Sequence, residues 1–460
     1  MICMMIKKEL LGYQKAAVEK LKKYKIGALY MDMGTGKTLT ALQLIKDRLD
    51  QNKIDHCLWL CPCSIKKETE ENIRDCAALP ENFLTICGIE TLSSSRKKFE
   101  KLMKLVHDKK CYLIVDESLL VKNFYAKRSE NIIKLSQYTK YKLILNGTPL
   151  CKNEADLFSQ WYILDWRILG YQSYWSFAAN HLEYDEKYTN KIRRVLDVEY
   201  LADKISPFTV EVKKEDVLKL PKKINFERGF DLNDEQAEHY YNVRNEFLDI
   251  VSLYGDYDDT IIFRTFTALQ QVTSGERITS NANEPIKHIS YYDDPNDNPR
   301  IKTLLNIICE IPDDEKIIIW CRYTHEIATI QTVLQEKYGD TVSLYYGELR
   351  PKKRAMQLEA FESKNRFLLA NKGCGSFGLN LQYCHYMIFY SNDFRFSTRT
   401  QAEDRVYRYG QEKDVYIYDI YASSKIDLRI LEAISNKESL LLRFKKILKE
   451  KDRQAIEDFL

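Results

Sequence analysis

The sequence predicts an α/β protein that has two parallel-sheet lobes with a helical insertion between them. Short apolar runs alternate with amphipathic stretches in two series, one before residue 150 and one after residue 300. Strands separated by helices along a chain form parallel sheets, because each return to the same edge needs a crossover. A glycine-rich turn also lies between the first apolar run and the helical stretch that follows it, at residues 34–38.

The first series opens with an amphipathic helix at residues 10–18. Four apolar runs follow it, and each is short enough for a buried strand of a parallel sheet. With the residues that close them, these predicted strands lie at 27–31, 56–62, 110–117 and 141–149, and helical stretches at 39–45 and 64–73 lie between them.

The turn at residues 34–38 has the composition of a phosphate-binding loop. Gly34 and Gly36 let backbone N–H groups face an anion, and the start of the next helix adds positive dipole. Lys37 is then placed to reach the β- and γ-phosphates of a nucleotide, and the Thr38 hydroxyl to hold Mg²⁺. Met31 departs from the full pattern, whose first position is glycine.

Polar residues close two further strands of this series. Ligands bind beyond the carboxyl ends of parallel strands, so Asp116, Glu117 and the turn at 147–149 are expected to converge with the glycine loop. Asp116 is predicted to hold Mg²⁺ through water, and Glu117 to act as the general base toward the attacking water. A solvated loop is the alternative for this acidic pair.

Residues 151–300 differ from the rest of the chain, because they show helical patterns without clear strands. Their aromatic residues predict the core of a helical insertion, with a stacking platform for bases as the alternative. These residues are Trp161, Trp166, Tyr171, Tyr174 and Trp175. Residues 290–299 have the composition of a surface loop.

The second series predicts another parallel α/β lobe, without a phosphate loop of its own. Its strand-like runs lie at residues 316–320, 342–346, 366–370, 386–390 and 415–420. Arg405 and Arg408 are spaced so that a helix would project both from one face, where they could stabilise charge on a γ-phosphate. A salt-bridged surface is the alternative.

Composition excludes several other classes of protein. No apolar run is long enough to span a membrane, and the apolar N-terminus lacks the basic region of a signal peptide. Twelve cysteines without an export signal indicate a reducing, cytoplasmic or otherwise intracellular location. A net charge of +3 requires any basic track for nucleic acid to be local.

Several motifs, in order along the chain, resemble those of the SWI/SNF-type ATPases of helicase superfamily 2. They are Leu11 to Gln14 (an adenine-reading Q motif), Asp32 to Thr38 (motif I), Leu60 to Pro62 with Ser64 (motif Ia), Asp116 to Asn123 (motif II), Asn146 to Leu150 (motif III), Ile318 to Tyr323 (motif IV), Gly375 to Leu381 (motif V) and Gln401 to Gln411 (motif VI). Ser118 and Leu119 depart from the family, which usually has Ala-His there. The resemblance covers nearly the whole chain.

This resemblance implies two RecA-like lobes that bind ATP and Mg²⁺. The implied catalytic residues are Glu117, Lys37, Arg405 and Arg408; the nucleotide contacts are Gln14, Met33, Gly34, Thr35, Gly36, Lys37, Thr38 and Gly378; the metal site is Thr38 and Asp116; and coupling or nucleic-acid contacts are Ser64, Asn123, Gly147, Thr148 and Gln401. The implied domains are an ATP-binding lobe at 1–220 with a helical insertion from about residue 155, a helical linker at 221–300, and a C-terminal lobe with a closing helix at 301–460.

The predicted function is DNA-dependent ATP hydrolysis that drives movement along duplex DNA, without sequence specificity. A DNA-bound protein is a further expected partner, and the small size suggests a bacterial, archaeal or viral source. One alternative is a helicase that separates or branch-migrates strands, marked by a wedge or hairpin within residues 260–300. An alternative of another class is a non-catalytic DNA-binding regulator.

Overall fold

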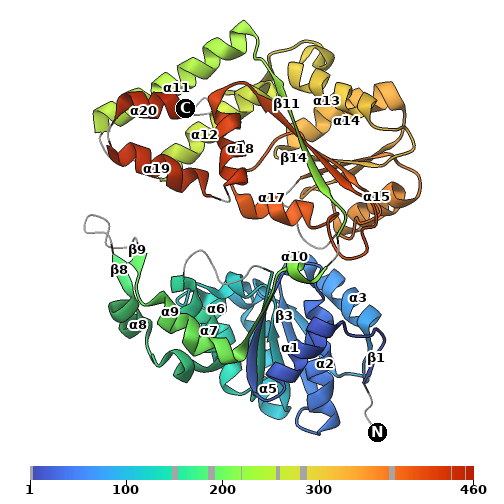
Figure 1. Cartoon of the computed structure of the whole chain (residues 1–460), viewed down its shortest axis with the longest axis vertical. Coiled ribbons are helices and arrows are strands. Elements are labelled where there is room, and N and C mark those ends of the chain that lie inside the picture. Colours follow the sequence, from blue (N-terminus) through green and yellow to red (C-terminus); the bar gives the residue numbers. More distant parts are fainter. Residues whose placement is uncertain are drawn as a thin grey trace. The chain divides into compact units, whose positions relative to one another are not determined.

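The computed structural model describes residues 4–147, 154–184, 192–218, 220–254, 259–279, 287–371, 379–436, 438–450 and 452–460. The chain forms two compact units, and the boundary between them lies between Lys219 and Leu220 (Figure 1). Each unit is built on one six-stranded sheet, in the order β10-β2-β7-β6-β3-β5 in unit 1 and β11-β18-β17-β14-β16-β15 in unit 2.

Every neighbouring pair of strands in both sheets is parallel. The prediction of two parallel-sheet lobes is therefore confirmed. The strands of unit 1 are β2 (Ile26–Met31), β3 (His56–Cys61), β5 (Leu84–Gly88), β6 (Cys111–Val115), β7 (Tyr141–Asn146) and β10 (Thr209–Val212), with short strands β1 (Met5–Ile6) and β4 (Ala77–Ala78) paired apart from the sheet.

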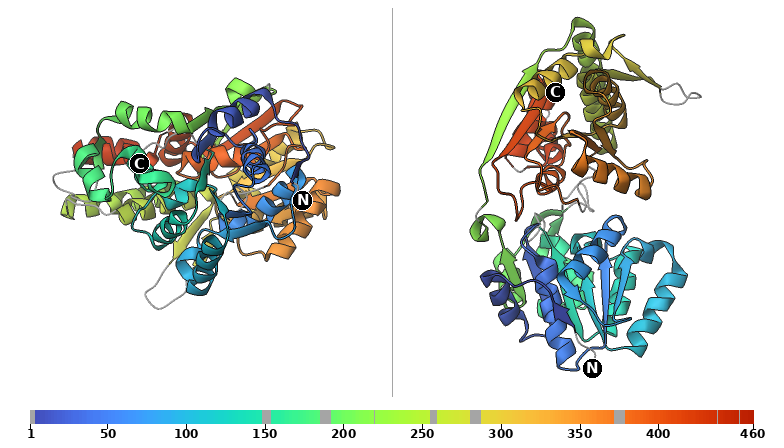
Figure 2. Two further views of the ribbon diagram at one scale, coloured as in Figure 1. Left: turned by 90° about the horizontal axis from the view of Figure 1, so that it is seen from below. Right: turned by 90° about the vertical axis from the view of Figure 1, so that its right-hand side faces the viewer.

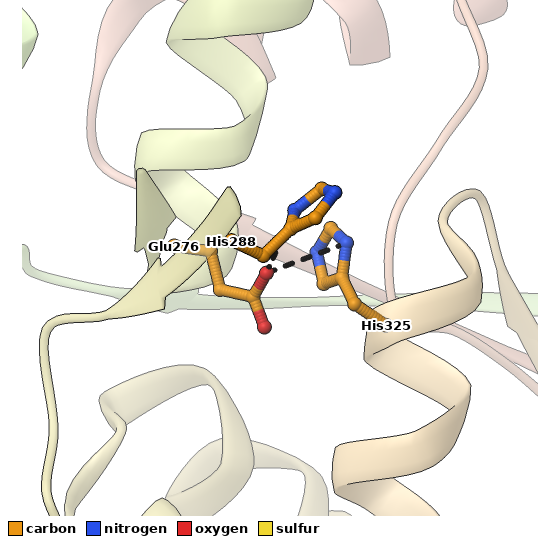
Figure 3. A group of neighbouring side chains, drawn as sticks. All are labelled: Glu276, His288 and His325. Atoms are coloured by element: carbon orange, nitrogen blue, oxygen red, sulfur yellow. Dashed lines mark ion pairs between the residues drawn. The ribbon is translucent and has the colours of Figure 1, made fainter. Parts of the chain in front are cut away.

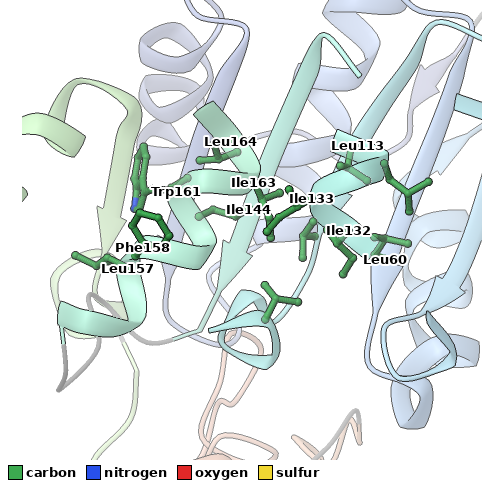
Figure 4. Close-up of a cluster of buried hydrophobic side chains, with 14 of the residues drawn as sticks. Leu60, Leu113, Ile132, Ile133, Ile144, Leu157, Phe158, Trp161, Ile163 and Leu164 are labelled. Atoms are coloured by element: carbon green, nitrogen blue, oxygen red, sulfur yellow. The ribbon is translucent and has the colours of Figure 1, made fainter. Parts of the chain in front are cut away.

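Side chains of the unit 1 strands alternate between two hydrophobic cores, one on each face of the sheet. On β3, for example, Leu58 and Leu60 belong to one core and Trp59 to the other. Helices lie along both faces of this sheet in the right-hand view of Figure 2. Figure 4 shows the first core, where Ile132 of α6 and Trp161 of α7 gather with residues of the strands. Burial on both faces explains why these strands are continuous apolar runs in the sequence.

The helices of unit 1 occupy most of the segments between its strands. They are α1 (Gly12–Leu21), α2 (Lys37–Asp50), α3 (Lys66–Cys76), α4 (Thr91–Ser94), α5 (Arg96–Asp108), α6 (Lys127–Gln137), α7 (Leu157–Leu169), α8 (Tyr174–His181), α9 (Val198–Ile205) and α10 (Lys214–Val217). Trp161 is fully buried, whereas Trp175 is 70% exposed, so the aromatic segment contributes to the core of unit 1 only in part.

The expectation that residues 151–300 lack strands is wrong at several places. Strands β8 (Leu182–Tyr184) and β9 (Ile192–Val195) form an antiparallel pair, and β10 extends the main sheet beside β2. β11 (Lys223–Phe230) pairs along its full length with β18. These strands were missed because their residues alternate between buried and exposed, or are too few for a clear apolar run.

Unit 2 completes its sheet with strands that follow one another through the second half of the chain. They are β14 (Ile317–Cys321), β15 (Val342–Tyr345), β16 (Phe367–Asn371), β17 (Tyr386–Phe389) and β18 (Val415–Ala422). Its described helices are α11 (Asp234–Tyr254), α12 (Asp259–Ser274), α13 (Pro299–Glu310), α14 (Thr324–Tyr338), α15 (Pro351–Ser363), α17 (Phe396–Glu403), α18 (Lys425–Ser435), α19 (Leu440–Glu450) and α20 (Arg453–Phe459).

A second hydrophobic cluster in unit 2 joins helices that are far apart in the sequence. Phe247 of α11 and Phe266 of α12 pack with Phe444 of α19 and Phe459 of α20. Next to this bundle, β12 (Glu276–Thr279) and β13 (Lys287–Ser290) form an antiparallel hairpin. The C-terminal helices α19 and α20 thus pack against α11 and α12, which follow β11 in the chain.

Unit 2 also contains a buried ion pair between Arg300 at the start of α13 and Asp427 of α18. Their side chains are 1% and 4% exposed, and Nη2 of Arg300 lies 2.7 Å from Oδ2 of Asp427. The same guanidinium donates to the backbone oxygen of Ile420 and to the hydroxyl of Ser274. Asp427 in turn accepts from the backbone N–H of Ala422, so the pair connects α12, α13, β18 and α18.

We expect Arg300→Ala to destabilise unit 2 by about 3–5 kcal/mol, because the variant leaves Asp427 buried without its cation. The matched control is Arg228→Ala, which breaks a pair with Glu310 on the surface of the same unit. That change should cost no more than about 1 kcal/mol. Urea unfolding of the full chain measures both, and equal effects would contradict the structural role of the buried pair.

Candidate active site

The candidate active site lies at the carboxyl edge of the unit 1 sheet. β2, β7 and β6 are neighbours there, although β6 and β7 come long after β2 in the chain. The glycine loop follows β2, Asp116 and Glu117 follow β6, and Gly147 follows β7. The structure therefore brings the glycine loop and the acidic pair together with Gly147, the described residue of the turn at 147–149, as expected from the sequence.

The glycine loop runs from the end of β2 into the first turn of α2. Gly34 and Gly36 have φ angles of 84° and 85°, in the left-handed region that favours glycine. A Cβ atom on Gly36 would lie 2.2 Å from Nε2 of Gln14, so the position also has no room for a side chain. The loop turns directly into the N-terminus of α2, where Thr38 is half-buried. This is the geometry of an anion-binding helix start.

Gln14 and Tyr13 of α1 hold the glycine loop from one side. Nε2 of Gln14 and the hydroxyl of Tyr13 both donate to the backbone oxygen of Thr35, each at 2.9 Å. Oε1 of Gln14 accepts from the backbone N–H of Leu11, also at 2.9 Å. Both ends of the buried amide are thus engaged within unit 1. The sequence analysis missed Tyr13, whose place in the motif beside Gln14 was the available signal.

Lys37 lies on the inner side of the loop. Its Nζ donates to the backbone oxygen of Met31 at 2.8 Å, and a Cβ atom on Gly147 would lie 3.7 Å from the same Nζ. Met33 flanks Gly147 on this side, with its Cγ 3.3 Å from that Cβ position. The ammonium group therefore faces the turn after β7, and a glycine there leaves room beside it.

The acidic pair follows β6 in a strained turn. Glu117 has a φ of 51°, uncommon for a residue with a side chain, and its backbone N–H donates to Oδ1 of Asp116 at 3.0 Å. Burial, and then the neighbouring Glu117 carboxylate, raise the pKa of Asp116 to about 7, while the Lys37 ammonium opposes this shift. A divalent cation beside Asp116 would stabilise its ionised form. The carboxylate and hydroxyl oxygens of Asp116 and Thr38 suit Mg²⁺, which prefers oxygen ligands.

Two contacts at this edge could not be found from the sequence. Oδ2 of Asp32, in the glycine loop, accepts from the backbone N–H of Lys214, just after β10. Ser118 donates to Oε1 of Gln160 on α7 at 2.6 Å, and both side chains are fully buried. The second contact gives a local role to the serine that replaces the family's usual alanine.

Arg405 and Arg408 belong to unit 2. Helix α17 ends at Glu403, so the expectation that both arginines project from one face of a helix is wrong. They follow it in a turn, with Arg405 only 2% exposed and Arg408 half-buried. Gln401 is half-buried on α17 itself. Arg399, which the sequence analysis did not single out, is buried beside Asp419 and Glu403.

The remaining predicted positions are spread over the two units. Ser64 and Asn123 are exposed, after β3 and β6 respectively. Thr148 and Gly378 lie outside the described residues. Among the helices that the structure describes, none combines the length and apolar character needed to cross a lipid bilayer.

Two sequence profiles match the chain in order. The SNF2-related domain matches residues 66–288, and the helicase conserved C-terminal domain matches residues 299–410. Together they cover most of the chain, including the acidic pair in unit 1 and Arg405 and Arg408 in unit 2.

Individual proteins show the same likeness at low identity. The chain is 25% identical over 344 residues to the putative ATP-dependent helicase/translocase YwqA of Bacillus subtilis, covering 71% of this chain and 35% of that protein. It is 24% identical over 457 residues to an uncharacterized ATP-dependent helicase of Mycoplasma pneumoniae, covering 94% and 42%. The probable global transactivator of Orgyia pseudotsugata multicapsid polyhedrosis virus is 22% identical over 470 residues, with 93% and 90% covered. The chain thus spans less than half the length of these two bacterial relatives.

The Sulfolobus solfataricus SWI2/SNF2 ATPase core in complex with dsDNA matches 98% of this chain and 95% of that one, at 23% identity and a TM-score of 0.41.

Proposed function

The chain belongs to the SNF2-related family of helicase-like ATPases, and from that membership we propose that it couples ATP hydrolysis to movement along duplex DNA. The observation that carries the proposal is the arrangement at the carboxyl edge of the unit 1 sheet. A phosphate-type loop, the ammonium of Lys37 and the Asp116–Glu117 pair meet there.

Nucleotide binding follows from the charges in this arrangement. Lys37 bonds to the neutral backbone oxygen of Met31, and a phosphate oxygen would be a stronger, charged acceptor for it. We propose that the γ-phosphate takes this bond, with the backbone of Met33 to Thr38 around the phosphates. Mg²⁺ would be held by Thr38 and Asp116, and Glu117 would take the proton from the attacking water.

Adenine recognition by Gln14 is part of the same proposal. The Gln14 amide already forms hydrogen bonds with Leu11 and Thr35, so a bound adenine would have to replace one of them. Because Thr35 belongs to the glycine loop, binding of the base would then affect the position of that loop. Arg405 and Arg408 are proposed to act on the phosphates when ATP draws the two lobes together, and Gly378 is proposed as a further nucleotide contact.

We propose duplex DNA as the track, bound through its phosphates because a translocase must tolerate any sequence. We propose that exposed Ser64 and Asn123 of unit 1, and Gln401 of unit 2, contact the DNA. Gly147 and Thr148 would couple hydrolysis to lobe movement. A DNA-bound protein as the displaced substrate fits the same activity.

The test is steady-state ATP hydrolysis without nucleic acid and with duplex DNA, single-stranded DNA or RNA. We expect duplex DNA to stimulate turnover most. Lys37→Ala should reduce kcat by about 10²–10³ under every condition, since it removes a charge aimed at the phosphates. The control is Lys46→Ala, which removes a lysine from the partly exposed face of the same helix, α2, and should keep wild-type turnover.

The alternatives give different results in this assay. Stimulation by single strands or RNA alone would favour the strand-separating helicase. Absence of turnover under all conditions would contradict the motor and leave a DNA-binding regulator.

One observation favours the helicase as a second candidate. The β12–β13 hairpin of unit 2 lies within residues 260–300, where a wedge or hairpin would mark the helicase alternative, and Ile289 on it is an exposed apolar residue. Apolar wedges inserted between base steps unstack nucleic acid.

Strand displacement from a partial duplex tests this second candidate. If the hairpin separates strands, Ile289→Ser should lower displacement several-fold while ATP hydrolysis continues. Tyr241→Ser, at an exposed aromatic residue on α11, is the control and should change neither. Translocation by the wild-type protein without any displacement would exclude the wedge.

A further inference from the structure

Three metal-ligand side chains from separate elements of unit 2 meet beside the hairpin. Glu276 begins β12, His288 lies on β13, and His325 is in the first turn of α14 (Figure 3). One ligand atom of each lies within 4.8 Å of those of the other two. The cluster is separate from the candidate active site, since all three of its residues belong to unit 2.

The hairpin register explains why Glu276 and His288 approach each other. Ile278 pairs with His288, and Glu276 pairs with Ser290. Glu276 and His288 therefore lie on the same face as diagonal neighbours, within reach of long side chains. The start of α14 supplies the third side chain, whose ring is stacked on that of Tyr323 with an interplanar angle of 9°.

The distances within the cluster are those expected of ligand atoms around one cation. Oε2 of Glu276 lies 3.2 Å from Nδ1 of His288 and 3.4 Å from Nδ1 of His325. Ligand atoms of a tetrahedral zinc site, with bonds of ~2.0–2.1 Å, are about 3.3 Å apart. Within the part of the chain that the structure describes, Oε2 of Glu276 is also buried and has no hydrogen-bond partner. Buried polar atoms of this kind call for an explanation.

We propose that Glu276, His288 and His325 bind one Zn²⁺ ion. Two imidazoles and one carboxylate are a frequent zinc ligand set, whereas Mg²⁺ and Ca²⁺ prefer oxygen ligands alone. The partial exposure of His288, at 40%, leaves a path for the ion and a fourth position for water.

The site would fasten the hairpin to the core of unit 2. His325 is followed by Glu326, whose carboxylate is buried and accepts hydrogen bonds from Ser274, from Ser391 and from the backbone of Arg322 and Tyr323. Ser274 also accepts from Arg300 of the buried ion pair. Zinc would therefore connect β12 and β13 to a network that already holds α12, α13 and α14 together.

Zinc binding by the full-length chain tests the proposal, with any histidine tag removed. After chelation, the protein is titrated with ZnCl₂ against a chromogenic chelator, and with CoCl₂ for the visible spectrum of a four-coordinate site. We expect one zinc per chain and a Co²⁺ spectrum of that type. His288→Ala and His325→Ala should each weaken zinc binding by at least about 100-fold, since loss of even an outer-shell partner costs 10–100-fold.

Two further variants make the result specific. Glu276→Gln keeps the shape of the side chain but loses the anionic ligand, and should also weaken binding. His107→Ala, at an exposed histidine on α5 of unit 1, should leave it unchanged. Because His288 is partly exposed, its variant is expected to fold normally, which circular dichroism checks. Failure of the wild-type chain to bind zinc, or equal binding by His288→Ala and His325→Ala, would overturn the proposal, and neither result depends on ATP turnover.

Discussion

Glu117→Gln is expected to lower kcat for ATP hydrolysis by about 10²–10⁴, the range contributed by general acid–base catalysis. Glutamine has the same size and reaches the same position after β6, but its amide cannot take a proton from water. The backbone N–H of residue 117 would still bond to Asp116, so the turn should persist. The expected signature is a large loss of turnover with little loss of nucleotide affinity.

Single-turnover hydrolysis and titration with a fluorescent ATP analogue measure these two quantities separately. Glu71→Gln is the matched control, because it makes the same change at an exposed residue of α3 and should not affect either quantity. Wild-type turnover in Glu117→Gln would show that another group activates the water. If Glu117→Gln lost both nucleotide binding and turnover, Glu117 would instead have a structural role in the nucleotide-binding site.

Arg408→Ala is expected to lower kcat by about 10³–10⁵ if this arginine stabilises charge on the γ-phosphate. Arg408 is half-buried in a turn after α17, so its removal should leave the stability of unit 2 nearly unchanged. Arg408→Lys should recover only a small part of the rate, because lysine lacks the planar, bidentate donor geometry.

The variant of Arg405, unlike that of Arg408, is expected to affect both catalysis and stability. Its side chain is 2% exposed, so Arg405→Ala should lower both kcat and the thermal stability of the chain. Arg395→Ala, at an exposed arginine just before α17, is the control for both measurements. Normal turnover in Arg408→Ala, measured with saturating duplex DNA, would contradict the proposed role and point to Arg405 alone.

The buried strands and the glycine loop were predictable because their signals are local. Residues 56–62 and 110–117 read as strands because both faces of the sheet are covered, which makes most of their positions apolar. The loop between β2 and α2 needs glycines for its left-handed backbone, and Gly34 and Gly36 supply them. Strands with mixed burial, such as β11, gave no such signal and were missed.

The helix predicted for Arg405 and Arg408 shows the limit of spacing arguments. Three-residue spacing places two side chains on one face only if the helix continues, and α17 ends at Glu403. Tertiary contacts of this segment decide its backbone: the carbonyl of Arg405 accepts from Leu381, and Gln411 donates to the backbone oxygens of Gln382 and Cys384. Helical spacing in the sequence cannot predict any of these contacts.

The sequence by itself determined the class of fold, the order of the strands with continuous apolar runs and the identity of the groups at the carboxyl edge of the first sheet. These follow from short-range physics: apolar periodicity, glycine conformation and the requirement that parallel strands be joined by crossovers. Only the tertiary structure decided which strands are neighbours, that Gln14 holds the glycine loop, and that Glu276, His288 and His325 meet. Those contacts join residues distant along the chain, and their positions are set by packing of whole elements, which no local pattern encodes.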